Sequence, residues 1–421
     1  MGKALLALAL QHDSVHLASL AFWPAAITLA PLSPSALPMS PIKLAIIRQK
    51  YNPSGGAERF VSRAIAALAG SVDVTLITRQ WEAHAGYQSL TVNPFYLGSV
   101  WREWSFARAV KRAVAASDFD LVQSHERIAA CDLYRAGDGV HREWLVQRRR
   151  QLGPLKRLGL WLNPQHHYAL AAEKALFTSP RLRAVICNSR MVADELKRWF
   201  ALPDSMLQVI YSGIDAEAFH PDKARLQRTP LRQQLGIAAD AAVLVYVGSG
   251  FERKGVATCL QALAQAGGDT QLVVVGHDKR ASRYRRLAAR FGLSGRVHFV
   301  GAQRNVLDWY GMADALFLPT LYDPFPNVAL EAFACGLPVL TSDKSGAAEF
   351  VREGENGFVR DALDATGFAR LIATRTTAAD WACMAAAARA TILPYSPAAM
   401  AEQLTALYAR LLAEKTQATP V

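Results

Sequence analysis

The sequence predicts an α/β protein built from two doubly wound, Rossmann-like domains that face each other across a cleft. Short runs of branched apolar residues alternate with amphipathic helical segments, which is the pattern of parallel sheets covered by helices. These runs fall into two series, and a stretch with few packing residues, Gly213 to Asp222, separates them as a hinge. The length of 421 residues is enough for two or three domains of ordinary size.

The apolar runs give the strands that we expect in each domain. The first series consists of residues 43–47, 73–78, 120–123, 184–188 and 207–210. The second series consists of residues 243–247, 271–275, 296–300, 315–319 and 338–341. We therefore expect one domain over residues 41–218, a second over 219–395, and a carboxyl-terminal helix, 396–421, that packs back on the first domain.

Residues 1–40 form an extension that is rich in Ala and Leu, contains four prolines and carries only Lys3 and Asp13 as charged side chains. Two interpretations are open. The extension is a weak signal or interfacial membrane segment, or the working domain begins at Met39, directly before the first expected strand. Amino-terminal sequencing of the native protein would separate the two.

The amino-acid composition excludes several classes of protein and of binding site. With 51% hydrophobic and 19% charged residues the chain is globular, which excludes a disordered or fibrous protein. Five widely spaced cysteines without a CxxC pair argue against a disulfide framework or a zinc site. The net charge of +12 is concentrated in two basic stretches, residues 142–157 and 279–290.

The two basic stretches differ in their apolar neighbours. The first mixes cations with leucine and tryptophan, which suits an anionic membrane surface, although a solvated helix with partly packed leucines is the alternative. The candidate membrane contacts are Trp144, Arg148, Arg149, Arg150, Lys156 and Arg157. The second stretch carries an apolar stripe from Tyr284 to Phe291, which indicates a core-packed helix with a basic outer face.

Two glycine-rich turns follow expected strands and lead into helices. Gly55 and Gly56 let the backbone approach a phosphate or sugar closely, but an ordinary turn explains them equally well. In the second turn Arg253 and Lys254 stand at a helix start, where two charges and the helix dipole suit a diphosphate; two solvated charges are the alternative. Neither turn matches a GxGxxG or P-loop pattern, so dinucleotide binding and an ATPase are unsupported.

The segment from Tyr322 to Pro338 is the most informative. Asn327 is expected to cap a helix that ends at Gly336, which puts Asp323 in the preceding loop, facing the cleft. Glu331 then projects from the first turns of that helix. Two carboxylates held in this way can bind vicinal hydroxyls of a sugar and a ribose.

These motifs, in this order, resemble the retaining glycosyltransferases of family 4, which have the two-domain GT-B fold. The resemblance covers about residues 42–415 and is closest in wording to the lipopolysaccharide core glucosyltransferases at 248–255 and 275–279. It implies an acceptor-side first domain and a second domain that binds the nucleotide sugar. In that family pattern, Arg253 and Lys254 hold the diphosphate and Glu331 holds the ribose.

The resemblance implies further site residues by position. Asp323 would take hydroxyls of the donor sugar, although the family usually has Glu there and Gly at the position of Pro326. The other implied donor contacts are Gly55, Gly56, Asn327 and Val328. His125 and Asp138 match acceptor-side positions and join Asp323 as catalytic candidates, while a buried structural role is the alternative for His125.

We expect no metal and no cofactor beyond a UDP-sugar as co-substrate. The triplet from Asp118 to Asp120 mimics a metal-binding DxD, but it leads into a strand at its amino end, away from the cleft. Arg253, Lys254 and helix dipoles can stabilise the charge of a departing diphosphate without a metal.

The resulting hypothesis is a retaining enzyme that moves a hexose, with glucose favoured, from a UDP-sugar to a lipid-linked saccharide such as the lipopolysaccharide core. It would work in the cytoplasm, peripherally on the inner face of the cytoplasmic membrane. The alternatives are a sugar-nucleotide epimerase of the same fold and a basic nucleic-acid-binding protein. No helix-turn-helix, RRM or zinc-finger signature supports nucleic-acid binding.

Overall fold

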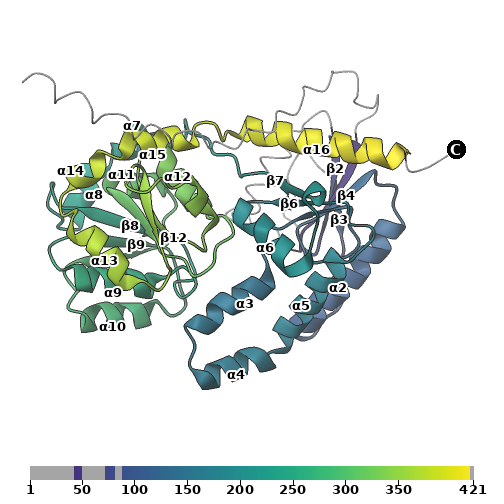
Figure 1. Cartoon of the computed structure of the whole chain (residues 1–421), viewed down its shortest axis with the longest axis horizontal. Helices are drawn as coiled ribbons and strands as arrows, with labels where there is room; N and C mark the ends of the chain where they lie inside the picture. Colours follow the sequence, from purple (N-terminus) through teal and green to yellow (C-terminus); the bar gives the residue numbers. More distant parts are fainter. Residues whose placement is uncertain (1–41, 50–71, 81–87, 418–421) are drawn as a thin grey trace, which may run out of the picture. The chain divides into compact units, whose positions relative to one another are not determined.

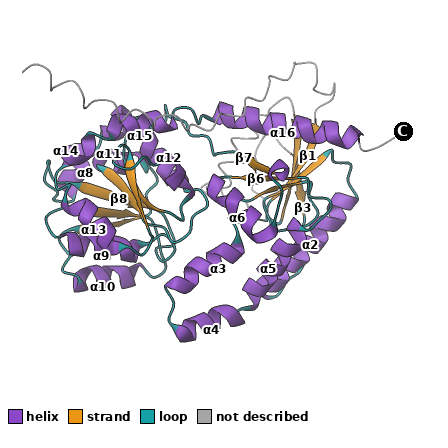
Figure 2. Ribbon diagram, in the orientation of Figure 1, coloured by secondary structure: helices purple, strands orange, loops and turns teal. Residues whose placement is uncertain are grey.

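The computed structural model describes residues 42–49, 72–80 and 88–417. All of these belong to one compact unit of the chain. Two parallel sheets, each accompanied by helices, build an amino-terminal half (residues 42–209) and a carboxyl-terminal half (residues 221–392), as Figures 1 and 2 show. The predicted α/β class with two doubly wound domains is confirmed.

Seven of the described strands form the sheet of the amino-terminal half, in the order β3-β2-β1-β4-β5-β6-β7, and all neighbours are parallel. Their bounds are β1 (Ile42–Ile47), β2 (Val72–Thr78), β3 (Gln88–Thr91), β4 (Leu121–Ser124), β5 (Leu133–Arg135), β6 (Ala184–Cys187) and β7 (Leu207–Val209). The five strands expected from apolar runs are all present. The sequence analysis missed β3, which is largely exposed, and β5, which has only three residues.

Six described strands form the second sheet, in the order β10-β9-β8-β11-β12-β13, again with parallel neighbours. They are β8 (Val243–Val247), β9 (Gln271–Val275), β10 (Val297–Gly301), β11 (Ala315–Leu318), β12 (Val339–Ser342) and β13 (Gly357–Arg360). The central strands β8, β11 and β12 are fully buried, which explains their near-continuous apolar sequences. Only the edge strand β13 was not anticipated.

Helices connect the strands in both halves. The amino-terminal half contains α2 (Gly98–Ala115), α3 (His141–Arg150), α4 (Pro154–Leu162), α5 (Pro164–Phe177), α6 (Arg190–Phe200) and the 3₁₀ helix η2 (Asp204–Met206). The carboxyl-terminal half contains α7 (Pro221–Arg225), α8 (Arg228–Gln234), α9 (Val256–Ala266), α10 (Ala281–Arg290), α11 (Leu307–Met312), α12 (Asn327–Ala334), the 3₁₀ helix η3 (Gly346–Phe350), α13 (Ala365–Ala373), α14 (Ala378–Ala382) and α15 (Ala385–Ile392).

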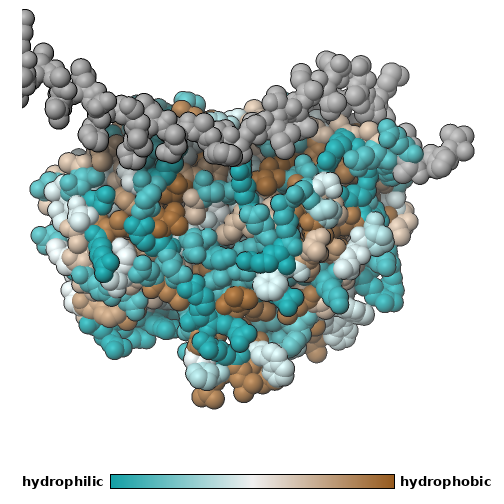
Figure 3. All heavy atoms as spheres, in the orientation of Figure 1, coloured by the Kyte–Doolittle hydropathy of each residue, from teal (hydrophilic) through white to brown (hydrophobic). Residues whose placement is uncertain are grey.

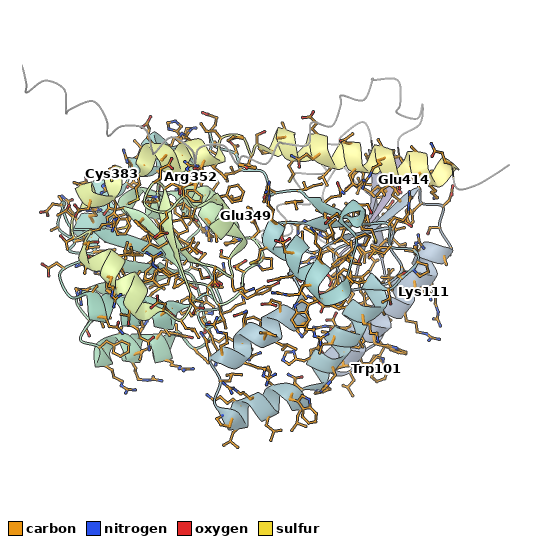
Figure 4. The ribbon with its side chains drawn as sticks, in the orientation of Figure 1. Trp101, Lys111, Glu349, Arg352, Cys383 and Glu414 are labelled. Carbon is orange, nitrogen blue, oxygen red and sulfur yellow. The ribbon has the colours of Figure 1, made fainter. Side chains whose placement is uncertain are left out.

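The last helix, α16 (Pro397–Gln417), returns the chain to the amino-terminal half. Its side chains Leu404, Tyr408 and Leu411 share a buried cluster with residues of β1, β2, β4, β5 and β6. Near its end, Glu414, labelled in Figure 4, accepts a 2.8 Å hydrogen bond from Arg183. One apolar face of the first sheet is therefore covered by a helix from the far end of the sequence.

The strand order marks the places where a ligand is expected. In each sheet the order reverses between two central strands, β1 and β4 in the first sheet and β8 and β11 in the second. Doubly wound sheets bind ligands beyond the carboxyl ends of the strands at such a reversal. A ligand is therefore expected at the loops that follow these four strands.

No helix in the described ranges combines the length and the apolar character needed to cross a bilayer. The extension expected over residues 1–40 lies outside the described residues.

Candidate active site

In the carboxyl-terminal half, Arg253 and Lys254 lie in the loop between β8 and α9, directly at one of the two reversal strands. The loop closes tightly at Gly255, whose φ is +82° and where a Cβ atom would overlap the carbonyl of Pro319. A glycine at this position allows the loop to approach Pro319, the residue directly after β11. The two cations are thereby brought next to the loop that contains Asp323.

Asp323 forms the centre of a compact charge cluster. Its Oδ2 atom lies 3.2 Å from Arg253 Nη1 and 3.5 Å from Lys254 Nζ. Burial alone would raise the pKa of the Asp323 carboxyl group, but the two adjacent cations outweigh this effect and lower it. For the ammonium group of Lys254, burial lowers the pKa, and the negative charge of Asp323 opposes this shift only in part. Three charged groups therefore share one largely buried site at the reversal between β8 and β11.

Backbone contacts fix the position of Asp323. Its amide donates to the carbonyl of Lys344 (3.0 Å), and its own carbonyl accepts from the amide of Gly346 (2.9 Å). Arg253 Nη1 additionally donates to the carbonyl of Tyr322, 2.9 Å away. The loops after β11 and β12 thus hold the carboxylate in a defined place.

Helix α12 begins beside this cluster. Pro326 occupies its N-cap position and Asn327 is its first residue, so the expected cap at Asn327 is wrong by one position. Asn327 and Val328 are half-buried in the first turn. Glu331 follows on the next turn; it is 3% exposed and accepts a 2.9 Å hydrogen bond from the hydroxyl of Tyr310.

In the amino-terminal half, His125 follows β4 at the other reversal. It is buried, and its Nε2 atom accepts a hydrogen bond from the side-chain amide of Gln123, 2.8 Å away. The hydroxyl of Tyr408 on α16 donates to the same Gln123 side chain. Burial, reinforced by the positive charges of Arg135 and Arg48, holds the pKa of His125 well below its ordinary value. His125 is therefore a neutral hydrogen-bonding group near pH 7.

The neighbouring Glu126 differs from Asp323 in its electrostatics. One of its carboxylate oxygens accepts from the amide of Gln49 at 2.9 Å and lies 3.6 Å from the guanidinium of Arg48. Burial dominates and raises the pKa of Glu126 to about 7, although Arg48 opposes the shift. Close to neutral pH this group is therefore divided between its acid and its carboxylate form.

Asp138 is exposed in the loop that follows β5. The next residue, Gly139, has a φ of +67°, and a Cβ atom there would overlap the hydroxyl of Tyr322 and approach the ring of Pro324. The loop of residues 136–140 (the Asp138 loop) therefore touches the loop of residues 319–326 (the Asp323 loop). Two of the three predicted catalytic residues lie on contacting loops from opposite halves.

The remaining predictions for the site have different outcomes. Gly55 and Gly56 lie outside the described residues. Asp118 and Asp120 interact with Lys43 at the amino ends of β1 and β4, at the opposite edge of the sheet from His125. Within the described ranges no group of three or more His, Cys, Asp or Glu side chains has the arrangement of a metal site.

The first basic stretch folds into α3 and α4. Four leucine and tryptophan side chains on α4 are strongly exposed, whereas Leu160 on the same helix is buried. Brown side chains gather at the lower edge of Figure 3 over this helix. The exposed fractions are 86% for Leu155, 52% for Leu158, 67% for Trp161 and 59% for Leu162. Figure 4 places Trp101, 43% exposed, on the first turns of α2.

The cations of this stretch are engaged to different degrees. Arg150 donates a 2.6 Å hydrogen bond to Asp361 of the carboxyl-terminal half, so its charge is compensated within the protein. Trp144 is half-buried rather than exposed, with the Arg148 guanidinium over its ring. In the second stretch Tyr284 and Ala288 of α10 are buried, as the apolar stripe predicted, but Phe291 at the end of the stripe is 36% exposed.

Four charged or polar side chains near the Asp323 loop had no role in the sequence analysis: Tyr322, Lys344, Glu143 and Glu195. Tyr322 is the first residue of the informative segment that ends at Pro338, and Glu143 is the one acidic residue of the first basic stretch, residues 142–157. Their one local signal is position, since Tyr322 and Lys344 follow β11 and β12 at the carboxyl edge of the sheet. The contacts between them join residues more than a hundred positions apart.

Comparison with known proteins identifies two family domains. Residues 54–218 match the model described as Glycosyltransferase Family 4, and residues 227–376 match the model described as Glycosyl transferases group 1. The lipopolysaccharide glucosyltransferase WaaG of Escherichia coli (strain K12) is 29% identical over 318 residues, which cover 74% of this chain and 83% of that protein. The lipopolysaccharide core biosynthesis glycosyltransferase LpsE of Rhizobium meliloti (strain 1021) is 37% identical over 141 residues, 34% of this chain and 41% of LpsE.

Solved structures show the same fold. The structure of WaaG matches with a TM-score of 0.73 at 23% identity and covers 87% of this chain and 99% of that one. The structure of Anabaena HepE with UDP and glucose matches with a TM-score of 0.67 at 21% identity, over 88% of this chain and all of HepE. These relatives do not favour the epimerase alternative. With two parallel-sheet halves and both family domains, the chain belongs to the GT-B glycosyltransferases that combine a family 4 domain with a group 1 domain.

Proposed function

We propose that this glycosyltransferase transfers a hexose, with glucose favoured, from a UDP-sugar to a lipid-linked saccharide such as the lipopolysaccharide core, with retention of anomeric configuration. The names of WaaG and LpsE support the acceptor class, and the name of WaaG supports glucose.

One observation carries the donor side of the proposal: Arg253 and Lys254 converge on a single carboxylate at the reversal between β8 and β11. Two cations within 3.5 Å of one anionic oxygen form a site that suits the negative charge of a diphosphate. Stabilisation of the departing diphosphate by these cations would be the main contribution to catalysis. Glu331, on the helix that begins beside them, is proposed to bind the ribose.

The acceptor side is proposed to use neutral or near-neutral groups. His125 is held neutral, and Glu126 has a pKa of about 7, so neither brings a firmly fixed charge to the first sheet's reversal. The acceptor hydroxyl would attack the same face of the sugar from which the diphosphate leaves. Asp138, exposed on the Asp138 loop, is proposed to contact the acceptor or the donor sugar there.

We propose that α4 rests on an anionic membrane surface. The exposed side chains Leu155, Leu158, Trp161 and Leu162 supply apolar contacts, and Lys156 and Arg157 are exposed cations on the same helix. An apolar face with interspersed cations is the composition of interfacial helices. Arg150 takes no part in this surface because Asp361 compensates its charge.

The experiment that tests the function offers the full chain a panel of UDP-sugars, each with and without a lipopolysaccharide core acceptor that lacks the terminal hexose. UDP release is followed, and the anomeric configuration of the product is determined by NMR. We expect acceptor-dependent release with one UDP-hexose, an α-linked product and no effect of a chelator. Acceptor-independent turnover or a β-linked product would contradict the proposal.

A further inference from the structure

Tyr322 connects the two halves through its hydroxyl group. The side chain is 2% exposed, and its oxygen donates to Glu195 Oε2 at 2.7 Å and accepts from the amide of Val140 at 2.8 Å. Glu195 lies on α6, and Val140 ends the Asp138 loop. Both hydrogen-bonding capacities of this buried hydroxyl are therefore used across the interface, on the residue directly before Asp323.

Lys344 makes a second connection. Its ammonium group lies 3.0 Å from Glu143 Oε1 and 3.4 Å from Glu195 Oε1, on α3 and α6 of the amino-terminal half. Its backbone carbonyl accepts the hydrogen bond from the amide of Asp323. Lys344 therefore binds the amino-terminal half through its side chain and holds Asp323 of the carboxyl-terminal half through its backbone.

These four side chains, the interhalf cluster, are charged or polar and buried for the most part. Glu143 and Glu195 are 4% and 3% exposed, and Lys344 is 20% exposed. Glu143 is further bound by Gln147, Arg198 and Trp199 of its own half. Glu195 receives hydrogen bonds from Tyr322 and Lys344. A displacement of the halves too small to admit water would leave this buried carboxyl group without its donors, which is costly and makes the cluster sensitive to the relative position of the halves.

We propose that Tyr322 and Lys344 are positioning residues, which fasten the Asp323 loop to α3, α6 and the Asp138 loop and so set Asp323 against the acceptor half during sugar transfer. The inference rests on the proposed function in so far as Asp323 contacts the donor sugar. It predicts that the cluster affects turnover more than it affects binding of UDP by Arg253 and Lys254.

The electrostatics of Glu195 support the assignment. Burial, reinforced by the nearby Glu143, raises the pKa of Glu195 to about 7, while Tyr322 and Lys344 oppose the shift. The groups that face Glu195 are thus Tyr322, Lys344 and Glu143. Ionisation of Glu195 completes the ion pair with Lys344, so the connection strengthens as the pH rises through 7.

The test compares Tyr322→Phe and Glu195→Gln with the matched control Tyr284→Phe, which removes a hydroxyl from the same half, on helix α10, and keeps the ring that packs on Phe251. For Tyr322→Phe we expect the amide of Val140 to exchange hydrogen at least tenfold faster, because its acceptor is gone. Turnover should fall about tenfold, while UDP affinity by calorimetry stays within twofold. The control should match the wild type in all three measurements.

Glu195→Gln keeps an acceptor for Tyr322 and removes the charge that faces Lys344, so it tests the connection even if Tyr322→Phe folds poorly. We expect it to abolish a rise in turnover centred near pH 7. The inference would be overturned if Tyr322→Phe kept the wild-type rates of hydrogen exchange at Val140 and of turnover. It would also be overturned if this variant lost as much UDP affinity as turnover. If the wild type neither binds UDP nor transfers a sugar, the proposed function fails, and exchange at Val140 alone decides on the positioning role.

Discussion

The two halves carry a carboxyl group at corresponding places, the buried Asp323 and the half-buried Glu126, and the pKa values of these two groups are shifted in opposite directions. Asp323 follows β11 and Glu126 closely follows β4, each strand being one of the pair at which its sheet reverses. Two cations lower the pKa of Asp323, whereas burial raises the pKa of Glu126 to about 7. Under the proposed function, this difference matches a carboxyl-terminal half that binds a diphosphate and an amino-terminal half that binds an uncharged saccharide.

The largest effect is expected from removal of both cations of the carboxyl-terminal half. Arg253→Ala combined with Lys254→Ala should lower turnover by at least about a thousandfold, because each charge that stabilises a developing anion contributes roughly 10²–10³. Turnover is measured as UDP release. A triple variant that also carries Asp323→Asn controls for the unpaired acid left behind, and near-normal turnover in the double variant would refute the proposed role.

Separate substitutions of the buried Asp323 and the exposed Asp138 should show different effects in the two halves. Asp323→Asn should lower turnover about 10- to 100-fold while UDP affinity stays or rises, since Arg253 and Lys254 lose their competing anion. Asp138→Asn should lower kcat/KM for the acceptor about tenfold and leave UDP affinity unchanged. Equal effects of both substitutions on UDP affinity would contradict the assignment of donor binding to the carboxyl-terminal half and acceptor binding to the amino-terminal half.

The two basic stretches are expected to differ in membrane binding. Leu155→Ser with Trp161→Ser on α4 should reduce binding to vesicles that contain phosphatidylglycerol at least tenfold, since burial of one such side chain contributes about 1.5–3 kcal/mol. Flotation of the full chain measures the bound fraction. The control is Arg283→Ser with Arg286→Ser on α10, and binding indifferent to anionic lipid and to salt would contradict the proposal.

The smallest effect is a difference in how stability depends on pH. The folded-state pKa of Glu126 lies above its unfolded value, so the folded state binds more protons between about pH 4.5 and 7. Raising the pH from 5 to 8 should therefore lower the free energy of unfolding of the wild type relative to Glu126→Gln. Asp323 has a lowered pKa, so its contribution is complete above about pH 4, and the difference from Asp323→Asn should stay flat.

Urea unfolding at several pH values measures both differences. Comparing each variant with the wild type cancels the contributions of the buried His125 and the half-buried His141, His166 and His298, whose lowered pKa values act in the opposite direction below pH 6.5. Parallel curves for the two variants would show that the acids do not differ as described.

Local patterns in the sequence predicted most of the fold. Strands with continuous apolar runs, such as β8 and β9, follow from the sequence because both faces of a parallel sheet are buried. Strand β3 cannot be predicted in this way, because an exposed strand at the edge of a sheet needs no run of apolar residues. The start of α12 was misplaced by one residue because Asn327 is a favoured cap while Pro326 occupies the position.

The candidate site was predictable to the extent that its residues lie close together in the sequence. Arg253, Lys254, Asp323 and Glu331 come from motifs with fixed spacing, and the first three meet in the structure. The contact of Tyr322 with Val140 spans 182 positions, and nothing local distinguishes either residue. Strand order decides which loops meet, and strand order is not visible in a pattern of apolar runs.

The central claim is that Arg253 and Lys254, rather than the overall basic charge of the chain, bind the nucleotide diphosphate. Calorimetric titration of UDP into the wild type, the Arg253→Ala and Lys254→Ala double variant, and an Arg283→Ala and Arg286→Ala double variant tests it directly, because both variants lose the same charge. We predict that the first variant loses at least a hundredfold in affinity and that the second binds like the wild type. Equal losses in the two variants would contradict the account.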